Sequence, residues 1–392
     1  MPDKTGILLI TRNLPPLVGG MERLLWHLVD ELRKYQKIDV IGPAGCRARV
    51  PESVKATEVT IRTFPLFLGH TLWASLVETL ARRPAVVLAG SGLTAPFAWI
   101  AARLTRARCA VYLHGLDIES SNPGYRRLWH PFLRRMDCVI ANSRFTRSVA
   151  IRAGIKEELL HTVLPGVSLP DLSIAKAYRS AFRSRYKIGD APVLLYIGRI
   201  TERKGLDVFV DQIFPRIVQE HPTAKLIVIG DEPALALTKS VSIRARIDAT
   251  LEQHCLARNV LFLGPRAHDD IEITEAYFAA DVHVFPVQDR PGDNEGFGMV
   301  AVEAAAHGLP TVAYDAGGVR DAVSGGRSGH LIKSGDAAGF SDAVSHELTH
   351  GVRPSLPARQ FSESLEWSHF GQRLNTIIQD LSTQQTSRSA TH

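Results

Sequence analysis

The chain contains two successive series of short apolar runs, and an amphipathic stretch follows most of these runs. The runs consist largely of Val, Ile and Leu without alternating polar residues, which is typical of strands buried on both faces, as in a parallel sheet. The expected strands lie at 6–11, 37–42, 85–90, 109–115, 138–143 and 161–166, and then at 192–198, 224–230, 259–264, 282–287 and 310–315. The expected helices lie at 21–34, 72–82, 96–104, 145–153, 206–218, 271–280 and 298–307. This pattern predicts an α/β fold with two doubly wound, Rossmann-like domains.

The domain boundaries follow from the place where the pattern restarts. Residues 1–170 are expected to form the first domain and residues 171–365 the second, because turn residues without hydrophobic periodicity separate the two series. A helix over 366–382 is expected to return to the first domain, and residues 383–392 are expected to form a flexible tail. Ligands of such sheets bind beyond the carboxyl ends of the strands, so we expect the site in a cleft between the two domains.

The composition is typical of a soluble globular protein and favours the cytoplasm. The 392 residues are 45% hydrophobic and 22% charged. The apolar run at 6–11 is too short for the core of a signal peptide, and Gly, Ser, Thr and Pro interrupt the most apolar window, 86–102. The cysteines are widely scattered and none has metal-ligand spacing, so we predict reduced thiols at Cys46, Cys109, Cys138 and Cys255.

Charge is unevenly distributed along the chain. Residues 1–170 contain 23 Lys and Arg against 13 Asp and Glu, a net charge of +10, whereas the remainder stands at −4. The basic part includes an aromatic and arginine-rich stretch that would suit an anionic membrane surface or a lipid-linked acceptor. Its arginines are Arg126, Arg127, Arg134 and Arg135. A solvated face over a partly buried helix is an equal alternative, so peripheral attachment to the inner face of the membrane stays open beside a cytoplasmic location.

Two strand ends in the first domain carry candidate site residues. Gly20 lies in a glycine-containing loop just before a helix, where the backbone can approach an anion closely, although a plain tight turn explains it equally well. His114 lies at the end of the strand at 109–115, and the alternative is a histidine whose hydrogen bonds are made by a neighbouring loop. Ser143 is most simply explained as a helix N-cap.

The second domain offers cations at one strand end and carboxylates at another. Arg199 and Lys204 follow the strand at 192–198 and together suit a diphosphate, although basic loop residues are ordinary. Glu295 precedes Gly296, Phe297 and Gly298, whose amides would lie at the positive end of the next helix.

Glu303 lies inside that alanine-rich helix, where a buried charge without a partner would be costly. A sugar diphosphate would fit the whole arrangement. Its phosphate would take the amides, and one carboxylate at each end would accept hydrogen bonds from paired hydroxyls.

These motifs together resemble the family-four retaining glycosyltransferases of the GT-B fold. The resemblance rests on "EGFGMVAVE", "GRITERKG", "VLPGV", "GGMERLL" and "AGGVRDAV", and it covers about residues 6–332. The loop "RPGDNEGFG" is also similar to that of the phosphatidylinositol mannosyltransferase branch.

The resemblance implies a role for each of the candidate residues. Arg199 and Lys204 would hold the nucleotide diphosphate, and Glu295 with the amides of 296–298 would bind the transferred sugar. Glu303 would bind the ribose hydroxyls, His114 would lie beside the sugar, and Gly20 would lie near the phosphate or the acceptor. Such enzymes need no bound metal, and we expect no cofactor other than the nucleotide-sugar substrate.

The expected activity is therefore transfer of a hexose to a glycan or a lipid-linked acceptor in cell-envelope synthesis. GDP-mannose is slightly preferred over a UDP-sugar as the donor, on the loop resemblance. An epimerase or phosphorylase of the same fold is the first alternative. A nucleic-acid-binding protein is a distant one, because the chain contains no recognised module and its basic residues interleave with the strand-end motifs.

Overall fold

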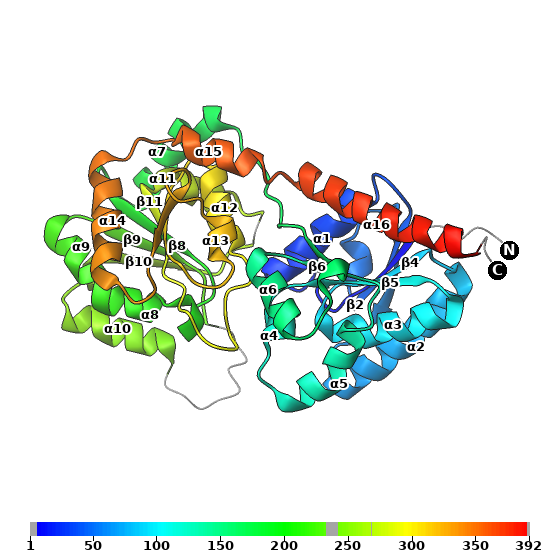
Figure 1. The fold of residues 1–392 in the computed structure, drawn as a ribbon. Coiled ribbons are helices and arrows are strands. Elements are labelled where there is room, and N and C mark those ends of the chain that lie inside the picture. Colours follow the sequence, from blue (N-terminus) through cyan, green and yellow to red (C-terminus); the bar gives the residue numbers. More distant parts are fainter. Residues whose placement is uncertain (1–5, 233–241, 268, 390–392) are drawn as a thin grey trace. The chain divides into compact units, whose positions relative to one another are not determined.

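A computed structural model describes residues 6–232, 242–267 and 269–389 of the chain. The chain divides into two compact units, of which unit 1 comprises Met1–Gly166 with Trp367–His392 and unit 2 comprises Val167–Glu366. Each unit is built around its own parallel sheet with helices on both faces (Figure 1). This confirms the predicted α/β fold with two doubly wound domains.

Unit 1 contains a seven-stranded sheet in the order β3-β2-β1-β4-β5-β6-β7. Its strands are β1 (Ile7–Ile10), β2 (Ile38–Pro43), β3 (Lys55–Val59), β4 (Val86–Ala89), β5 (Arg108–Leu113), β6 (Cys138–Ala141) and β7 (Leu160–Thr162). Its helices are α1 (Gly20–Leu32), α2 (Phe64–Arg82), α3 (Ala95–Thr105), α4 (Leu116–Glu119), α5 (Pro123–Leu133), α6 (Arg144–Arg152) and α16 (Trp367–Ser389).

Unit 2 contains a six-stranded sheet in the order β10-β9-β8-β11-β12-β13. Its strands are β8 (Val193–Ile197), β9 (Lys225–Ile229), β10 (Val260–Gly264), β11 (Val282–Phe285), β12 (Thr311–Tyr314) and β13 (Gly329–Ile332). Its helices are α7 (Ala175–Arg185), α8 (Leu206–Val208), α9 (Phe214–Glu220), α10 (Ile243–Gln253), α11 (Ile271–Ala279), α12 (Met299–Ala306), α13 (Val319–Ala322), α14 (Ala337–His350) and α15 (Leu356–Glu363).

The central strands are buried along their whole length, as their uninterrupted apolar sequences predict. Every residue of β1 and β4 is buried, and the two strands pair in parallel from Ile7 opposite Val86 to Ile10 opposite Ala89. Because all the strands run parallel, the loops at their carboxyl ends gather along one edge of each sheet. That edge is where the candidate side chains lie.

The last helix, α16, packs against α1 within unit 1. The Trp367 indole stacks on the His27 ring, with 3.9 Å between the ring centroids, and Gln36 donates a hydrogen bond to the Asn375 side chain. The helix extends to Ser389, beyond residue 383, where a flexible tail was expected to begin. Residues 390–392 lie outside the described residues.

The expected helix at 206–218 is interrupted by a widened turn. The chain passes from α8 through a π-turn at Phe209–Ile213 into α9. Pro215 explains the interruption, because proline has no amide hydrogen to donate and its ring crowds the carbonyl four residues earlier. Ser143 caps α6, as predicted, by accepting a hydrogen bond from the Thr146 amide.

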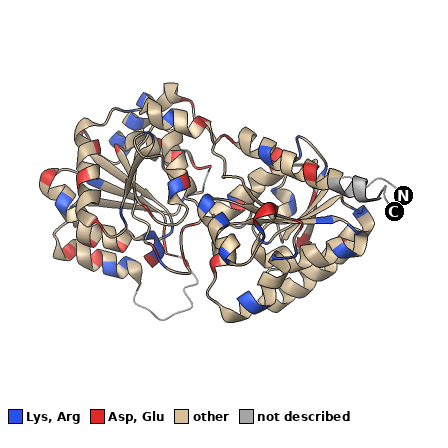
Figure 2. Ribbon diagram, viewed as in Figure 1, with Lys and Arg blue, Asp and Glu red and all other residues tan. Residues whose placement is uncertain are grey.

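The four cysteines are free thiols in the structure. Both basic and acidic residues are present in each unit (Figure 2). Among the described residues, no helix is both long enough and apolar enough to cross a membrane.

Glycine at position 205 is required by a close backbone approach. Gly205 has a left-handed φ of +68°, and a Cβ atom there would lie 2.1 Å from the Pro286 carbonyl oxygen. Gly189 has a similar φ of +59°, but apart from the glycine itself and its two chain neighbours, no heavy atom of the described residues lies within 4 Å of the position where its Cβ would be. The two positions therefore separate the cost of the backbone conformation from the cost of a steric clash.

We expect Gly205→Ala to destabilise unit 2 more than its matched control, Gly189→Ala. The control should lower the free energy of unfolding by roughly 1–2 kcal/mol, the cost of left-handed backbone in a residue with a Cβ. Gly205→Ala should add about 1–3 kcal/mol for the clash. Denaturant unfolding of the two variants measures the difference, and equal effects would contradict the proposed close approach.

Candidate functional site

A buried ion pair lies at the carboxyl edge of the unit 2 sheet. Lys204 ends the 3-10 turn η5 (Glu202–Lys204), which follows β8, and Glu295 lies in the loop after β11. The Lys204 Nζ atom is 2.7 Å from Glu295 Oε2, and each side chain is only 13% exposed. Arg203 contacts the same carboxylate oxygen at 2.5 Å and Asp293 at 3.2 Å. β8 and β11 are neighbours in the sheet, which is why their loops meet here.

Burial and charge act against each other in this pair. Burial lowers the pKa of the Lys204 ammonium below its usual value, although the Glu295 carboxylate opposes that shift. Burial alone would raise the pKa of Glu295, but the Lys204 and Arg203 cations outweigh it and hold that pKa below its usual value. Glu295 is therefore ionised at neutral pH.

Arg199 lies apart from this pair but within its electrostatic reach. Its guanidinium is exposed, and its charge acts on both Lys204 and Glu295. The Tyr196 hydroxyl fixes the backbone at this position by donating to the Arg199 carbonyl oxygen over 3.1 Å. Arg199 is thus an exposed cation near a buried one.

The loop of Gly296, Phe297 and Gly298 is held by a second glycine-rich loop, which follows β12. The Gly318 amide donates to the Glu295 carbonyl oxygen over 2.7 Å. A Cβ atom on Gly318 would lie 2.0 Å from the Gly296 carbonyl oxygen, so only glycine allows the two loops to pack this closely. The motif "AGGVRDAV" therefore has a structural role in shaping the "EGFG" loop.

Backbone amides of the "EGFG" loop remain available as donors at the start of α12. Among the described residues, the amides of Gly296, Phe297 and Gly298 donate to no backbone carbonyl oxygen. Gly298 adopts a left-handed φ of +105° immediately before the helix, and Phe297 is buried. Free amides at the positive end of a helix can bind a phosphate or a sugar oxygen.

Glu303 lies inside α12 and is buried. Its Oε2 atom accepts a hydrogen bond from the Tyr277 hydroxyl over 3.0 Å, so the carboxylate is partly satisfied by the protein itself. The His307 ring stacks on Tyr277 with 4.6 Å between the centroids, which fixes the tyrosine. This partner of Glu303 comes from α11 and was not apparent in the sequence.

A buried histidine lies close to the ion pair without joining it. His283 belongs to β11 and is fully buried. Its Nδ1 atom is 3.0 Å from the Thr311 hydroxyl. Burial, together with the nearby Lys204 ammonium, lowers the pKa of His283 to about 3. The ring is therefore neutral at physiological pH and adds no positive charge to the site.

His114 lies at the carboxyl edge of the unit 1 sheet and is buried. Its Nε2 atom lies 2.7 Å from the Gly90 carbonyl oxygen after β4, and because a carbonyl only accepts, Nε2 carries the hydrogen. Asp117 holds the surrounding loops together, since its carboxylate accepts from the amides of Gly92, His114 and Gly115. The Nε2 atom of His114 therefore makes its hydrogen bond to a neighbouring loop, which is the alternative interpretation of this histidine.

Gly20 is the first residue of α1 and is exposed. Two residues later, the buried Glu22 carboxylate accepts a hydrogen bond from Asn13 over 2.8 Å. The adjacent Gly19 allows this, because a Cβ there would lie 2.4 Å from Glu22 Oε2.

The structure groups the predicted residues by unit. Lys204, Glu295 and the amides of 296–298 come together in unit 2 with Arg199 nearby, and Glu303 lies one helix turn further on. Gly20 and His114 belong to unit 1. The sequence analysis singled out Lys204 but missed its neighbour Arg203, because only the fold shows that the Arg203 side chain also turns toward Glu295.

Comparison with known proteins identifies the family. Residues 191–350 match the model for group 1 glycosyl transferases, and residues 18–170 match the model for glycosyltransferase family 4. A GDP-mannose-dependent α-(1-6)-phosphatidylinositol monomannoside mannosyltransferase of Mycolicibacterium smegmatis is 27% identical over 385 residues, which cover 95% of this chain and 98% of the relative. A D-inositol 3-phosphate glycosyltransferase of Acidothermus cellulolyticus is 32% identical over 210 residues, 52% of this chain and 43% of that protein.

Solved structures show the same fold. The Anabaena protein HepE, crystallised with UDP and glucose, superposes with a TM-score of 0.78 at 21% identity, over 96% of this chain and 99% of that chain. The sucrose-phosphate synthase of Thermosynechococcus elongatus gives a TM-score of 0.74 at 19% identity, over 96% and 99% of the two chains. The chain therefore belongs to the family-four glycosyltransferases and has their two-domain GT-B fold.

Proposed function

We propose that this glycosyltransferase moves a hexose from a nucleotide-diphosphate sugar to a glycan or lipid-linked acceptor, with retention of the anomeric configuration. The observation that carries the proposal is the buried cluster of Lys204, Arg203 and Glu295 beside the free amides of 296–298. Cations and oriented amides bind a diphosphate, and a carboxylate accepts from sugar hydroxyls.

The diphosphate would compete with Glu295 for the Lys204 ammonium. In the structure Glu295 serves as the counter-ion of Lys204, which limits the cost of burying either charge. A phosphate at Lys204 and Arg199 would take over that role and leave Glu295 free to accept hydrogen bonds from the sugar. The charge of Arg203 would keep Glu295 ionised meanwhile.

The transfer step would use the leaving diphosphate as the base. The acceptor oxygen would form its bond to the anomeric carbon on the face from which the phosphate oxygen leaves, and the electrons of the broken bond would pass to the diphosphate. The same phosphate oxygen would take the proton of the acceptor hydroxyl. Negative charge grows on the phosphate in this step, so Arg199 and Lys204 would stabilise the transition state more than the ground state, without a metal ion.

Three further roles follow from the resemblance and belong to the proposal. Glu303 would accept hydrogen bonds from the ribose hydroxyls, with Tyr277 orienting its carboxylate. His114 would contact the transferred sugar, and Gly20 would allow close approach of the phosphate or the acceptor. GDP-mannose is the preferred donor, supported by the name of the Mycolicibacterium relative, while a UDP-sugar is the next choice.

A lipid-linked acceptor of cell-envelope synthesis is supported by two surface features of unit 1. Arg126, Arg127, Arg134 and Arg135 are all exposed, on α5 and directly after it. α2 presents an exposed apolar stripe, in which Leu66 is 58%, Trp73 60% and Leu80 55% exposed. Both helices pack on α3, and basic residues together with exposed apolar side chains suit the surface of an anionic bilayer.

Removal of either phosphate-binding cation should reduce turnover. We expect Arg199→Ala and Lys204→Ala to lower kcat by about 10²–10³-fold, because each would lose a donor aimed at the developing charge. Arg216→Ala, at an exposed arginine of α9, is the matched control and should retain activity. An assay that separates a new glycoside from an isomerised donor measures the rate, and full turnover by both site variants would overturn the assignment.

Nucleotide binding should depend on Glu303. Glu303→Gln keeps the side-chain size but removes the charge, and we expect roughly tenfold or greater loss of nucleotide affinity. Shifts in the unfolding temperature with GDP, UDP and ADP measure this and rank the bases, with GDP expected to give the largest shift. Glu220→Gln, at an exposed position of α9, controls for loss of a carboxylate. Equal shifts for wild type and Glu303→Gln would contradict the ribose contact.

Membrane attachment should depend on the unit 1 arginines. We expect reversal of Arg126, Arg127, Arg134 and Arg135 to glutamate to abolish cosedimentation with phosphatidylglycerol vesicles, whereas reversal of four exposed cations of unit 2, Lys176, Lys187, Arg216 and Lys333, should not. Trp73→Ser should also weaken binding, through the apolar stripe. Unchanged vesicle binding by the arginine variant would remove the membrane proposal and leave the transferase proposal intact.

A further inference from the structure

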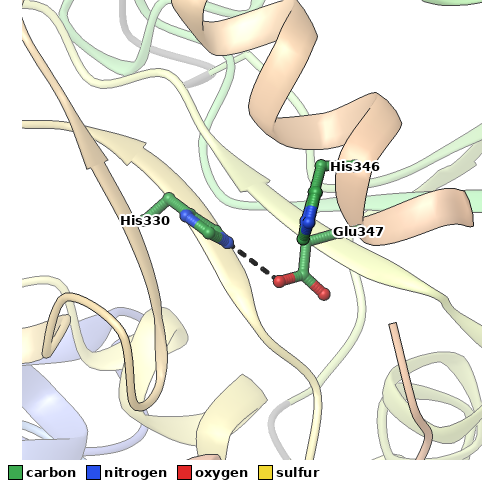
Figure 3. Close-up of side chains that lie close together, drawn as sticks. All are labelled: His330, His346 and Glu347. Atoms are coloured by element: carbon green, nitrogen blue, oxygen red, sulfur yellow. Dashed lines mark hydrogen bonds and ion pairs between the residues drawn. The ribbon is translucent and has the colours of Figure 1, made fainter. Parts of the chain in front are cut away.

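The C-terminal end of α14 carries a cluster of metal-ligating side chains outside the site described above. The helix ends with His346, Glu347, Leu348, Thr349 and His350, which is the H-E-x-x-H pattern. In the structure His346 and Glu347 lie close to a third such residue, His330 of β13 (Figure 3). The site proposed for the nucleotide sugar shares no residue with this cluster.

The three side chains point toward one another. The His330 Nε2 atom lies 2.9 Å from Glu347 Oε1, and one ligand atom from each of the three residues lies within 4.8 Å of the other two. The cluster borders a pocket of about 490 Å³, whose lining also includes Arg327, His350 and Val352. Solvent therefore has access to the ligand atoms.

The donor set of two imidazoles and one carboxylate suits zinc and similar transition-metal ions. Zinc binds such ligands at about 2.0–2.2 Å, so its ligand atoms lie closer together than the widest separation here. His346 is exposed, and a rotation of its side chain would bring the ring nitrogen inward. Magnesium and calcium prefer sites made of oxygen ligands alone.

Arg353 orients the Glu347 carboxylate and also lowers the expected affinity of the cluster for a metal ion. Its guanidinium lies 2.9 Å from Glu347 Oε2 and also donates to the Asp281 carbonyl oxygen, so it fixes the carboxylate with Oε1 toward His330. Burial would raise the pKa of Glu347, but hydrogen bonds from His330 and Arg353 hold it below its usual value. The positive charge of Arg353 opposes a second cation, so we expect affinity well below that of an all-cysteine structural site.

We propose that His330, His346 and Glu347 bind one divalent transition-metal ion, preferentially zinc, with water from the adjoining pocket completing the coordination. The ion would join β13 to the end of α14 and so fasten the last strand of the unit 2 sheet. The arrangement differs from that of the metalloproteases with the same short pattern, because Glu347 itself is a ligand here rather than the base that activates water.

The test uses the full chain without a polyhistidine tag, treated with a chelator and then titrated calorimetrically with zinc chloride, in the absence of any sugar donor. We expect one zinc ion per chain with a dissociation constant of about 1 μM, and a higher unfolding temperature when zinc is present. His330→Gln and His346→Gln should each weaken binding about tenfold or more, because each loses one of three protein ligands. His161→Gln, at an exposed histidine of β7, is the matched control and should bind zinc like the wild type.

The unfolding temperature of each variant without zinc shows that it is folded, and His346 is exposed enough for its replacement to be tolerated. Competing magnesium in excess should leave zinc binding unchanged. Wild-type affinity in His330→Gln or His346→Gln would overturn the proposal, as would binding of several ions per chain or none. Because no sugar donor is present, these results are independent of the transferase activity.

Discussion

A buried charge pair at the edge of a parallel sheet is the interaction on which the arrangement of unit 2 depends. Lys204 and Glu295 can approach to 2.7 Å only because the loops after two neighbouring strands meet, and those strands are neighbours although 84 residues of chain separate Ile197 from Val282. Removing two ions from water costs several kcal/mol for each ion unless they are paired. The two side chains must therefore be positioned precisely enough to pair. The glycines at 205, 317 and 318 make this possible, because they allow the backbones of the loops to pack against each other.

The two units use the edges of their sheets in opposite electrostatic ways. In unit 1 the organising side chain is an acid, Asp117, which collects the amides of three residues from two loops. In unit 2 the organising side chains are cations gathered around one carboxylate, and the amides of the "EGFG" loop remain unused among the described residues. An anion would therefore find free donors in unit 2, whereas those around Asp117 are already engaged. This difference favours unit 2 for the diphosphate binding that we propose.

The sequence predicted the buried strands well because their signal is local. A run such as Val86–Ala89 has no polar position to face solvent, and the structure buries all of it. It did not reveal β3 and β13, which lie at the outer edges of their sheets and contain polar or glycine residues, such as Lys55 and Gly329. An edge strand has one neighbour and partial exposure, so its sequence carries less of the hydrophobic pattern.

The candidate site was predictable to the level of motifs but not of contacts. Position relative to the strand ends was enough to single out Lys204 and Glu295, yet their direct pairing and the presence of Arg203 depend on tertiary structure. The same holds for Tyr277, which reaches Glu303 from another helix. Pro215 is a different case, because its effect on the helix is local and the sequence contained the signal.

The chain leaves unit 1 after Gly166 and re-enters it at Trp367, so unit 2 is an insertion within unit 1. The two crossing segments run side by side, since the Val167 amide donates to the Leu365 carbonyl oxygen over 2.8 Å. During synthesis on the ribosome, all of unit 2 is therefore made before the last helix of unit 1. The surface of unit 1 that α16 covers, including part of α1, stays uncovered until this helix emerges from the ribosome. Its apolar side chains are therefore exposed to chaperones for most of translation.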